Sequence, residues 1–193
     1  MTDGHDQRTF TAIAISGSLR AQSSNTGLIH LAQRLAPAAL SITIVDWIDE
    51  LPWMNPDLES DPPAVVLRWW STVRDADALI IGLPEYNGTP PGLAKNALDW
   101  ATRPPGDRAI ANTVVAMLSS AGRSGGANAQ GSVTPILQFL SAGVVIEPAV
   151  QLSGIAERID ADGNTSDQTI IDAVSAKLDA IVSTLQQRHA LIE

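Results

Sequence analysis

Apolar and polar positions follow two patterns that alternate along most of the chain. Short, continuous apolar runs are typical of strands buried on both faces, and between them apolar residues recur at helical spacing. The apolar runs predict strands over residues 9–16, 40–47, 77–84, 111–119 and 143–152. The helical spacing predicts helices over residues 25–36, 63–75, 90–101, 127–141 and 166–188. The fifth strand is expected to be short because it contains Pro148.

The alternation of strands and helices predicts the α/β fold class. Such a chain forms a parallel sheet with right-handed crossovers and with helices on both faces. Its length suits one domain spanning residues 1–193, with residues 1–8 as a flexible tail. Ligands of these sheets bind beyond the carboxyl ends of the strands. We therefore expect the loops after the first, third and fourth strands to form one site.

The loop after the first predicted strand is rich in small hydrogen-bonding groups. It reads GSLRAQSSNT, from Gly17 to Thr26, and leads directly into a predicted helix. A helix N-terminus presents unpaired N–H groups and a partial positive charge, and Arg20 adds a full charge, so the loop predicts a phosphate site. The alternative is that Ser24 or Asn25 only caps the helix. The loop lacks the Gly-Lys-Ser/Thr ending of nucleoside-triphosphate sites and the glycines of the dinucleotide fingerprint.

Four segments resemble the NADPH-dependent FMN reductase family, flavodoxin-like enzymes that include FMN, azo, quinone and chromate reductases. GSLR followed by Ser23 and Asn25 is similar to the flavin-phosphate loop of that family. PEYNGTPPGLAKNALDW, residues 84–100, is similar to its isoalloxazine loop and the following helix. Residues 50–59 are similar to its loop after the second strand, and residues 121–126 to its third flavin loop.

The resemblance implies a flavodoxin-like three-layer sandwich, built on a five-stranded parallel sheet of order 2-1-3-4-5. It also implies one FMN per subunit in a homodimer or homotetramer. The residues implied to hold the phosphate are Ser18, Arg20, Ser23, Asn25 and Thr26. Those implied to line the flavin ring are Pro84, Glu85, Tyr86, Asn87 and Gly88. Those implied to close its other edge are Ser119, Gly122, Arg123, Gly125 and Gly126.

Several residues near these loops have more than one interpretation. Tyr86, the only tyrosine in the chain, either stacks on the flavin ring or fixes a turn. Glu85 either contacts the flavin or pairs with an arginine at a subunit interface. Trp53 either belongs to a core or interface, like most of the tryptophans, or shapes the acceptor pocket. Trp100 and Arg103 are expected near the place where a nicotinamide or a second subunit docks.

Composition excludes several classes of function. The chain has no cysteine, which excludes thiol catalysis and thiolate metal sites, and its three histidines have no ligand spacing. A net charge of −9 argues against nucleic acid and anionic membranes as partners. No apolar run is long enough to span a membrane, and the first residues do not form a signal peptide, so a cytoplasmic location is expected. No histidine lies in a candidate site loop, which argues against a serine hydrolase.

The resemblance implies an FMN-dependent oxidoreductase that passes a hydride from NADPH or NADH through FMN. The acceptor would be a small molecule such as a flavin, quinone, azo dye or metal oxyanion. The cofactor carries this chemistry, so no protein nucleophile is expected. Either Arg123 or backbone N–H groups near N1–C2 of the ring are expected to stabilise the reduced flavin. Two alternatives stay open, namely a flavodoxin-type electron carrier, which an acidic protein suits, and a flavin-binding module with incidental redox activity.

Overall fold

The computed structural model describes residues 8–140 and 142–191, and it contains the predicted strands and helices. The strands are β1 (Phe10–Ser16), β2 (Leu40–Val45), β3 (Ala78–Gly82), β4 (Val114–Ala121) and β5 (Gly143–Ser153). The helices are α1 (Ser24–Arg34), α2 (Ala64–Arg74), α3 (Gly92–Ala101), α4 (Ala127–Phe139) and α5 (Gln168–Ala190). Two short 3-10 helices that the pattern did not predict, Ile48–Glu50 and Pro56–Leu58, follow β2. Residues 1–7 of the predicted tail and residue 141 of the predicted fourth helix lie outside the described residues.

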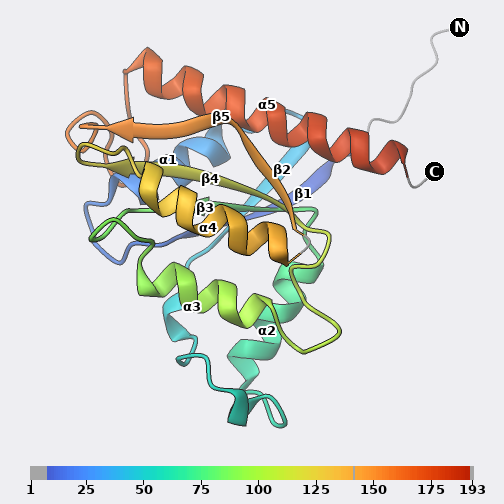
Figure 1. Ribbon diagram of the computed structural model, residues 1–193. Helices are drawn as coiled ribbons and strands as arrows, with labels where there is room; N and C mark the ends of the chain where they lie inside the picture. The colour runs from blue at the N-terminus through green and yellow to red at the C-terminus, as the bar shows by residue number, and fades with distance from the viewer. Residues whose placement is uncertain (1–7, 141, 192–193) are drawn as a thin grey trace, which may run out of the picture.

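The sheet has the predicted topology. Its strands are parallel and lie in the order β2-β1-β3-β4-β5. Helices α1 and α5 cover one face, and α2, α3 and α4 cover the other (Figure 1). This arrangement is the flavodoxin-like three-layer sandwich. Both faces of the sheet are buried, which explains why its strands are continuous apolar runs rather than alternating ones.

Each face of the sheet has its own hydrophobic core. Ile13 and Ile15 of β1 point into the core beneath α2, α3 and α4. Ala12 and Ala14, one residue out of phase, point into the core beneath α1 and α5. The two cores hold the strand ends, and therefore the loops that follow them, in fixed positions.

Strand β5 ends one residue beyond its predicted bounds and is irregular in its middle. Val145 pairs with Ala116 of β4, but the next matched pair is Val150 with Leu118, so the register shifts between them. Pro148 lies inside this irregular segment, which explains why a strand tolerates it.

A buried lysine from α5 is placed at this irregularity. The Lys177 residue is 1% exposed, and its Nζ donates a hydrogen bond of 2.9 Å to the Val145 carbonyl. Burial lowers the pKa of Lys177 to about 8, and the negative charge of Glu147 opposes part of that shift. Lys177 therefore supplies a hydrogen-bond donor to a buried carbonyl, and the desolvation of its own charge opposes this gain.

This lysine should make stability depend on pH in the alkaline range. Between the folded pKa of about 8 and the higher pKa of an unfolded lysine, the unfolded chain binds more protons, so the free energy of unfolding rises with pH. We expect urea unfolding to show this rise in the native protein and not in Lys177→Met. Lys95→Met, which removes the chain's other lysine on a half-exposed helix face, is the matched control. An equal rise in Lys177→Met would contradict the assignment.

Candidate functional site

Two adjoining pockets open at the sheet edge where β1, β3 and β4 end. The first, here called the polar pocket, has a volume of about 280 Å³ and lies between the loops that follow β1, β3, β4 and β5. The second, here called the apolar pocket, has a volume of about 680 Å³ and lies between the loops that follow β1, β2 and β3. Arg20 and Tyr86 line both pockets. The structure thus brings the predicted loops together at one edge.

More than half of the predicted site residues line the polar pocket. They are Ser18, Arg20, Ser23, Asn25, Pro84, Glu85, Tyr86 and Gly122. The sequence analysis missed six further residues of its wall, which are Ser24, Ser120, Ala121, Gly154, Ile155 and Ala156. The last three follow β5, in a segment with no distinctive motif. Their place in the site could have been predicted only from the rule that the loops after parallel strands lie at the same end of the sheet.

Seven predicted residues do not line either pocket. Three of them, Asn87, Gly88 and Arg123, lie on exposed loops. A fourth is Thr26, whose hydroxyl oxygen lies 2.7 Å from that of Ser16. Ser119 is fully buried inside the sheet and accepts a hydrogen bond from Gln130. Gly125 and Gly126 both have positive φ, and a Cβ on Gly126 would lie 2.3 Å from that of Ser119. These two glycines shape the turn into α4 rather than the pocket wall.

The first turn of α1 is fastened to the end of β4. The Asn25 side chain donates to the Ser120 carbonyl and accepts from the Ser120 N–H, with both distances 2.8 Å. Ser24 adds a hydroxyl contact of 3.0 Å to Ser120. The N-cap is Ser23, which accepts from the Thr26 N–H, so the alternative in which Ser24 or Asn25 caps the helix was wrong. The amide of Asn25 therefore positions two elements in this structure.

The polar pocket has the donors that a phosphate requires. The first turn of α1 leaves the N–H groups of Ser24 and Asn25 without helical partners, and both residues line the pocket. Ser18 adds a hydroxyl, which accepts a 3.3 Å hydrogen bond from the Arg20 N–H. The Arg20 side chain is exposed and has no ion pair within the described part of the chain. A dianionic phosphate fits this set of one cation, hydroxyls and helix N–H groups.

Glu85 has a structural role that the sequence did not predict, beside the two proposed for it, a flavin contact and an ion pair at a subunit interface. Its carboxylate accepts hydrogen bonds from the Asn128 side chain at 2.9 Å, the Asn128 N–H at 3.0 Å and the Ala129 N–H at 3.2 Å. It therefore caps the first turn of α4, a helix whose own N-cap, Gly126, has no side chain. These hydrogen bonds, above all the one from the Asn128 side chain, lower the pKa of Glu85. The loop after β3 is tied to α4 by this carboxylate.

The residues after Glu85 form a tight turn. The Tyr86 N–H donates to the Thr89 carbonyl at 2.9 Å, and the Thr89 N–H donates back at 3.1 Å. Between them, Asn87 and Gly88 both have positive φ, at 54° and 76°. The turn uses the Tyr86 N–H internally, whereas no hydrogen bond within the described residues uses the N–H groups of Asn87 and Gly88. The tyrosine ring is half exposed and lies at the junction of the two pockets.

Exposed apolar side chains surround the apolar pocket. Trp53 is 75% exposed and Leu19 is 71% exposed, and both line it. Trp53 thus belongs to the pocket rather than to the core. Its loop is held by Asn96 of α3, whose side chain accepts from the Met54 N–H at 2.8 Å and donates to the Pro52 carbonyl at 3.0 Å. Trp53 is therefore exposed on a loop that the scaffold supports.

Trp100 and Arg103, expected near the place where a nicotinamide or a second subunit docks, line neither pocket. Trp100 is fully buried and donates a 2.7 Å hydrogen bond to the Pro52 carbonyl. Arg103 pairs with Glu59 at 3.2 Å. Both residues support the loop that carries Trp53.

None of the described helices is long and apolar enough to cross a membrane. Residues 8–140 and 142–191 contain no group of three His, Cys, Asp or Glu side chains arranged to hold a metal ion.

Comparison with known proteins identifies what this arrangement resembles. The sequence model of the NADPH-dependent FMN reductase family matches residues 10–157. An NAD(P)H-dependent FMN reductase of Pseudomonas aeruginosa is 36% identical over 171 residues, which cover 88% of this chain and 91% of the relative. A 2-hydroxy-1,4-benzoquinone reductase of Burkholderia is 38% identical over 151 residues, covering 78% and 82%. FerB of Paracoccus denitrificans, a flavoenzyme NAD(P)H:(acceptor) oxidoreductase, superposes with a TM-score of 0.84 at 33% identity over 93% of this chain and 98% of FerB.

The turn at Gly88 should not tolerate a side chain. Its φ of 76° disfavours any residue with a Cβ, although no atom lies within 4 Å of that position. We expect Gly88→Ala to destabilise the protein by about 1 kcal/mol in chemical unfolding. Gly131→Ala, in α4 with equally open space and no positive φ, should be neutral or stabilising. Equal stabilities for the two variants would show that the turn is not constrained.

The Glu85 cap should be lost in acid. Because its folded pKa is lowered, its contribution to stability is present above the pKa of an unfolded glutamate and disappears as the pH falls through the folded value. We expect Glu85→Ala to lower the melting temperature at neutral pH and to differ less from the native protein in acid. Glu157→Ala, on an exposed loop, is the control. A deficit that is the same at both pH values would argue against an ionised cap.

Proposed function

The chain belongs to the NADPH-dependent FMN reductase family, and from this premise we propose that it is an FMN-dependent NAD(P)H:quinone oxidoreductase. FMN is the cofactor and NAD(P)H the electron donor of this family. The observation that carries the proposal is the pair of adjoining pockets joined at Arg20 and Tyr86. One pocket has the chemistry of a phosphate site, and the other has the size and apolar rim that a flat organic ring requires.

In this proposal the polar pocket holds the phosphate of FMN. Arg20 supplies the full positive charge, and Ser18 with the first turn of α1 supplies neutral donors. Asn25 acts as a positioning residue, because its amide hydrogen bonds to Ser120 hold that turn in place. Thr26, Ser119, Gly125 and Gly126 support the surrounding turns, whereas a direct contact of Arg123 with the flavin stays a prediction.

The apolar pocket is proposed to receive the flavin ring and the molecules that exchange electrons with it. FMN supplies the two-electron transfer between nicotinamide and acceptor. Trp53, Leu19 and Pro91 present apolar surface that excludes water and packs against flat rings. A quinone is flat and largely apolar, which suits these walls, and two similar proteins are a benzoquinone reductase and a quinone reductase of Escherichia coli.

The protein is proposed to position the reactants rather than to act as an acid or base. Among the described residues that line the two pockets there is no histidine, cysteine or lysine. The carboxylate of Glu85 is held by α4, which keeps it ionised and directs it away from proton transfer. The acidic side chains of Asp49 and Glu50, at the edge of the apolar pocket, favour neutral acceptors over metal oxyanions.

A homodimer or homotetramer remains part of the proposal. Leu19, Trp53 and Tyr86 gather exposed apolar surface at the apolar pocket. Such surface is typical of a place covered by a ligand or by another subunit. Light scattering of the purified protein tests this part separately.

Purified protein loaded with FMN and desalted should retain the flavin and oxidise NADPH or NADH steadily when a neutral benzoquinone is added. Arg20→Ala should weaken FMN binding at least about tenfold, because it removes a charged hydrogen-bond donor from the phosphate. Arg108→Ala, which removes an exposed arginine over the Phe139 ring, is the matched control and should retain normal affinity.

The outcomes separate the alternatives. Retained flavin without steady nicotinamide oxidation would favour the electron carrier or the flavin-binding module. Unchanged FMN affinity in Arg20→Ala would remove this residue from the phosphate site.

A further inference from the structure

A second polar pocket lies at the opposite end of the sheet. It has a volume of about 330 Å³ and is lined by the residues at which β1, β3 and β4 begin, including Phe10, Asp77 and Thr113, and by the last turns of α2 and α5. The flavin pockets lie beyond the other ends of these strands. No part of the proposed reductase site uses this pocket.

Basic side chains dominate its wall. Arg8, Arg74, Arg188 and His189 all line it, and Asp77 is the only acidic residue among residues 8–140 and 142–191 that does. The chain has only 12 lysines and arginines against 21 acidic residues, so three arginines around one pocket run against the charge of the whole protein. Positive charge concentrated in a concave site attracts anions even when the protein is acidic overall.

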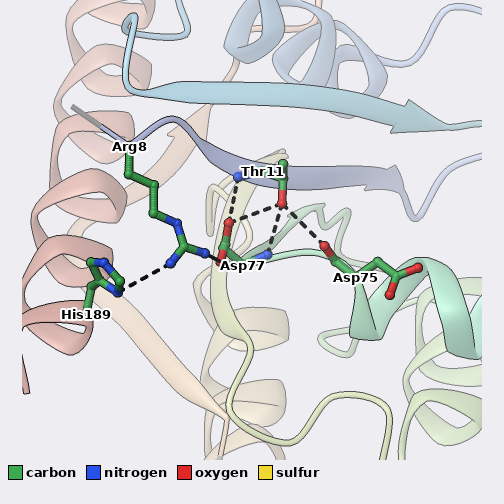
Figure 2. A network of polar contacts seen from close by, with 5 residues as sticks. All are labelled: Arg8, Thr11, Asp75, Asp77 and His189. Carbon is green, nitrogen blue, oxygen red and sulfur yellow. Dashed lines mark hydrogen bonds and ion pairs between the residues drawn. The ribbon is translucent and has the colours of Figure 1, made fainter. Parts of the chain in front are cut away.

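The one acidic residue of the wall is already neutralised (Figure 2). Figure 2 shows Asp77 between Arg8 and Thr11. Its carboxylate accepts from Arg8 at 3.0 Å and from the N–H and hydroxyl of Thr11 at 2.8 and 3.1 Å. Arg8 also donates to the His189 ring at 3.3 Å. Asp75 joins the network through its backbone carbonyl, and its carboxylate points away from Arg8.

The other two arginines retain donors for a ligand. Arg74 pairs with Asp107 through one terminal nitrogen, at 2.9 Å. Arg188 donates one terminal nitrogen to the Asn112 carbonyl at 2.9 Å, and within residues 8–140 and 142–191 it has no carboxylate partner. Asp77 and Asp107 neutralise Arg8 and Arg74, so the charge of Arg188 gives the pocket a net positive charge. The hydrogen bond to Asn112 fixes the orientation of the Arg188 guanidinium. Planar guanidinium groups of this kind bind phosphate with two parallel hydrogen bonds.

Part of the wall is apolar. Phe10, Val114 and Leu185 form this part, and each is buried in the protein except where it meets the pocket. A simple inorganic anion would leave this apolar surface in contact with water. An organic group attached to the anion would cover it, which favours an ester over a free ion.

We propose that this pocket binds a small organic phosphate monoester at the end of the sheet opposite the flavin site. Arg188 is its principal phosphate ligand, Arg74 adds a second guanidinium, and the Arg8–Asp77 pair holds Arg8 and His189 in place. The apolar wall receives the organic group. This site depends on the fold alone and does not require the proposed reductase activity.

Calorimetric titration of FMN-saturated protein with phenyl phosphate tests the proposal, since the flavin site is then filled. We expect saturable binding that weakens as salt is added, and weaker binding of inorganic phosphate, which lacks the apolar group. Arg188→Gln should weaken phenyl phosphate binding at least about tenfold. Arg68→Gln, the same change at an arginine that stacks on Trp47 outside the pocket, should leave binding within about twofold.

Several outcomes would overturn the proposal. Absence of saturable binding in the native protein would do so whatever the variants show. Unchanged affinity of Arg188→Gln for phenyl phosphate would also overturn it. Loss of phenyl phosphate binding in Arg20→Gln but not in Arg188→Gln would place the ester at the flavin site. If Arg188→Gln proves unstable by circular dichroism, Arg74→Gln provides the same comparison, because Arg74 bonds only to the exposed 107 loop.

Discussion

The amide of Asn25 is the interaction on which the site depends most. Its two hydrogen bonds to the backbone of Ser120 fix the N-terminus of α1 against the end of β4. Strand β1, which leads into α1, is separated from β4 by β3. The loop after β1 and the loop after β4 therefore face each other at a set distance, and the polar pocket lies between them. Without this connection, Arg20 and the helix N–H groups would not converge on one anion.

Two similar connections complete the scaffold. Glu85 ties the loop after β3 to the first turn of α4, and Asn96 ties the loop after β2 to α3. Each uses one side chain to satisfy backbone groups of a distant segment, and this fastens the loop to a neighbouring helix. The side chains left exposed, above all Arg20, Tyr86 and Trp53, are those proposed to meet the ligands. A cofactor enzyme of this kind needs position more than reactive side chains.

The order of strands and helices could be predicted because a sheet buried on both faces requires continuous apolar runs, and those runs are visible in the sequence. The place of the site followed from the parallel topology, and its identity from GSLR and PEYN. The role of Glu85 could not be predicted, because its partners lie on a helix more than forty residues later. The same is true of Lys177, whose partner is a carbonyl of β5, and of the wall after β5, which carries no motif.

A crystal structure of the protein with FMN would test the central claim most directly, because the phosphorus atom is easily located. The account predicts that the phosphate lies in the polar pocket, within hydrogen-bonding distance of the Arg20 guanidinium and of the first N–H groups of α1. Asn25 should still be bonded to Ser120. A phosphate bound elsewhere, or one that displaces the Asn25 amide from Ser120, would contradict the account.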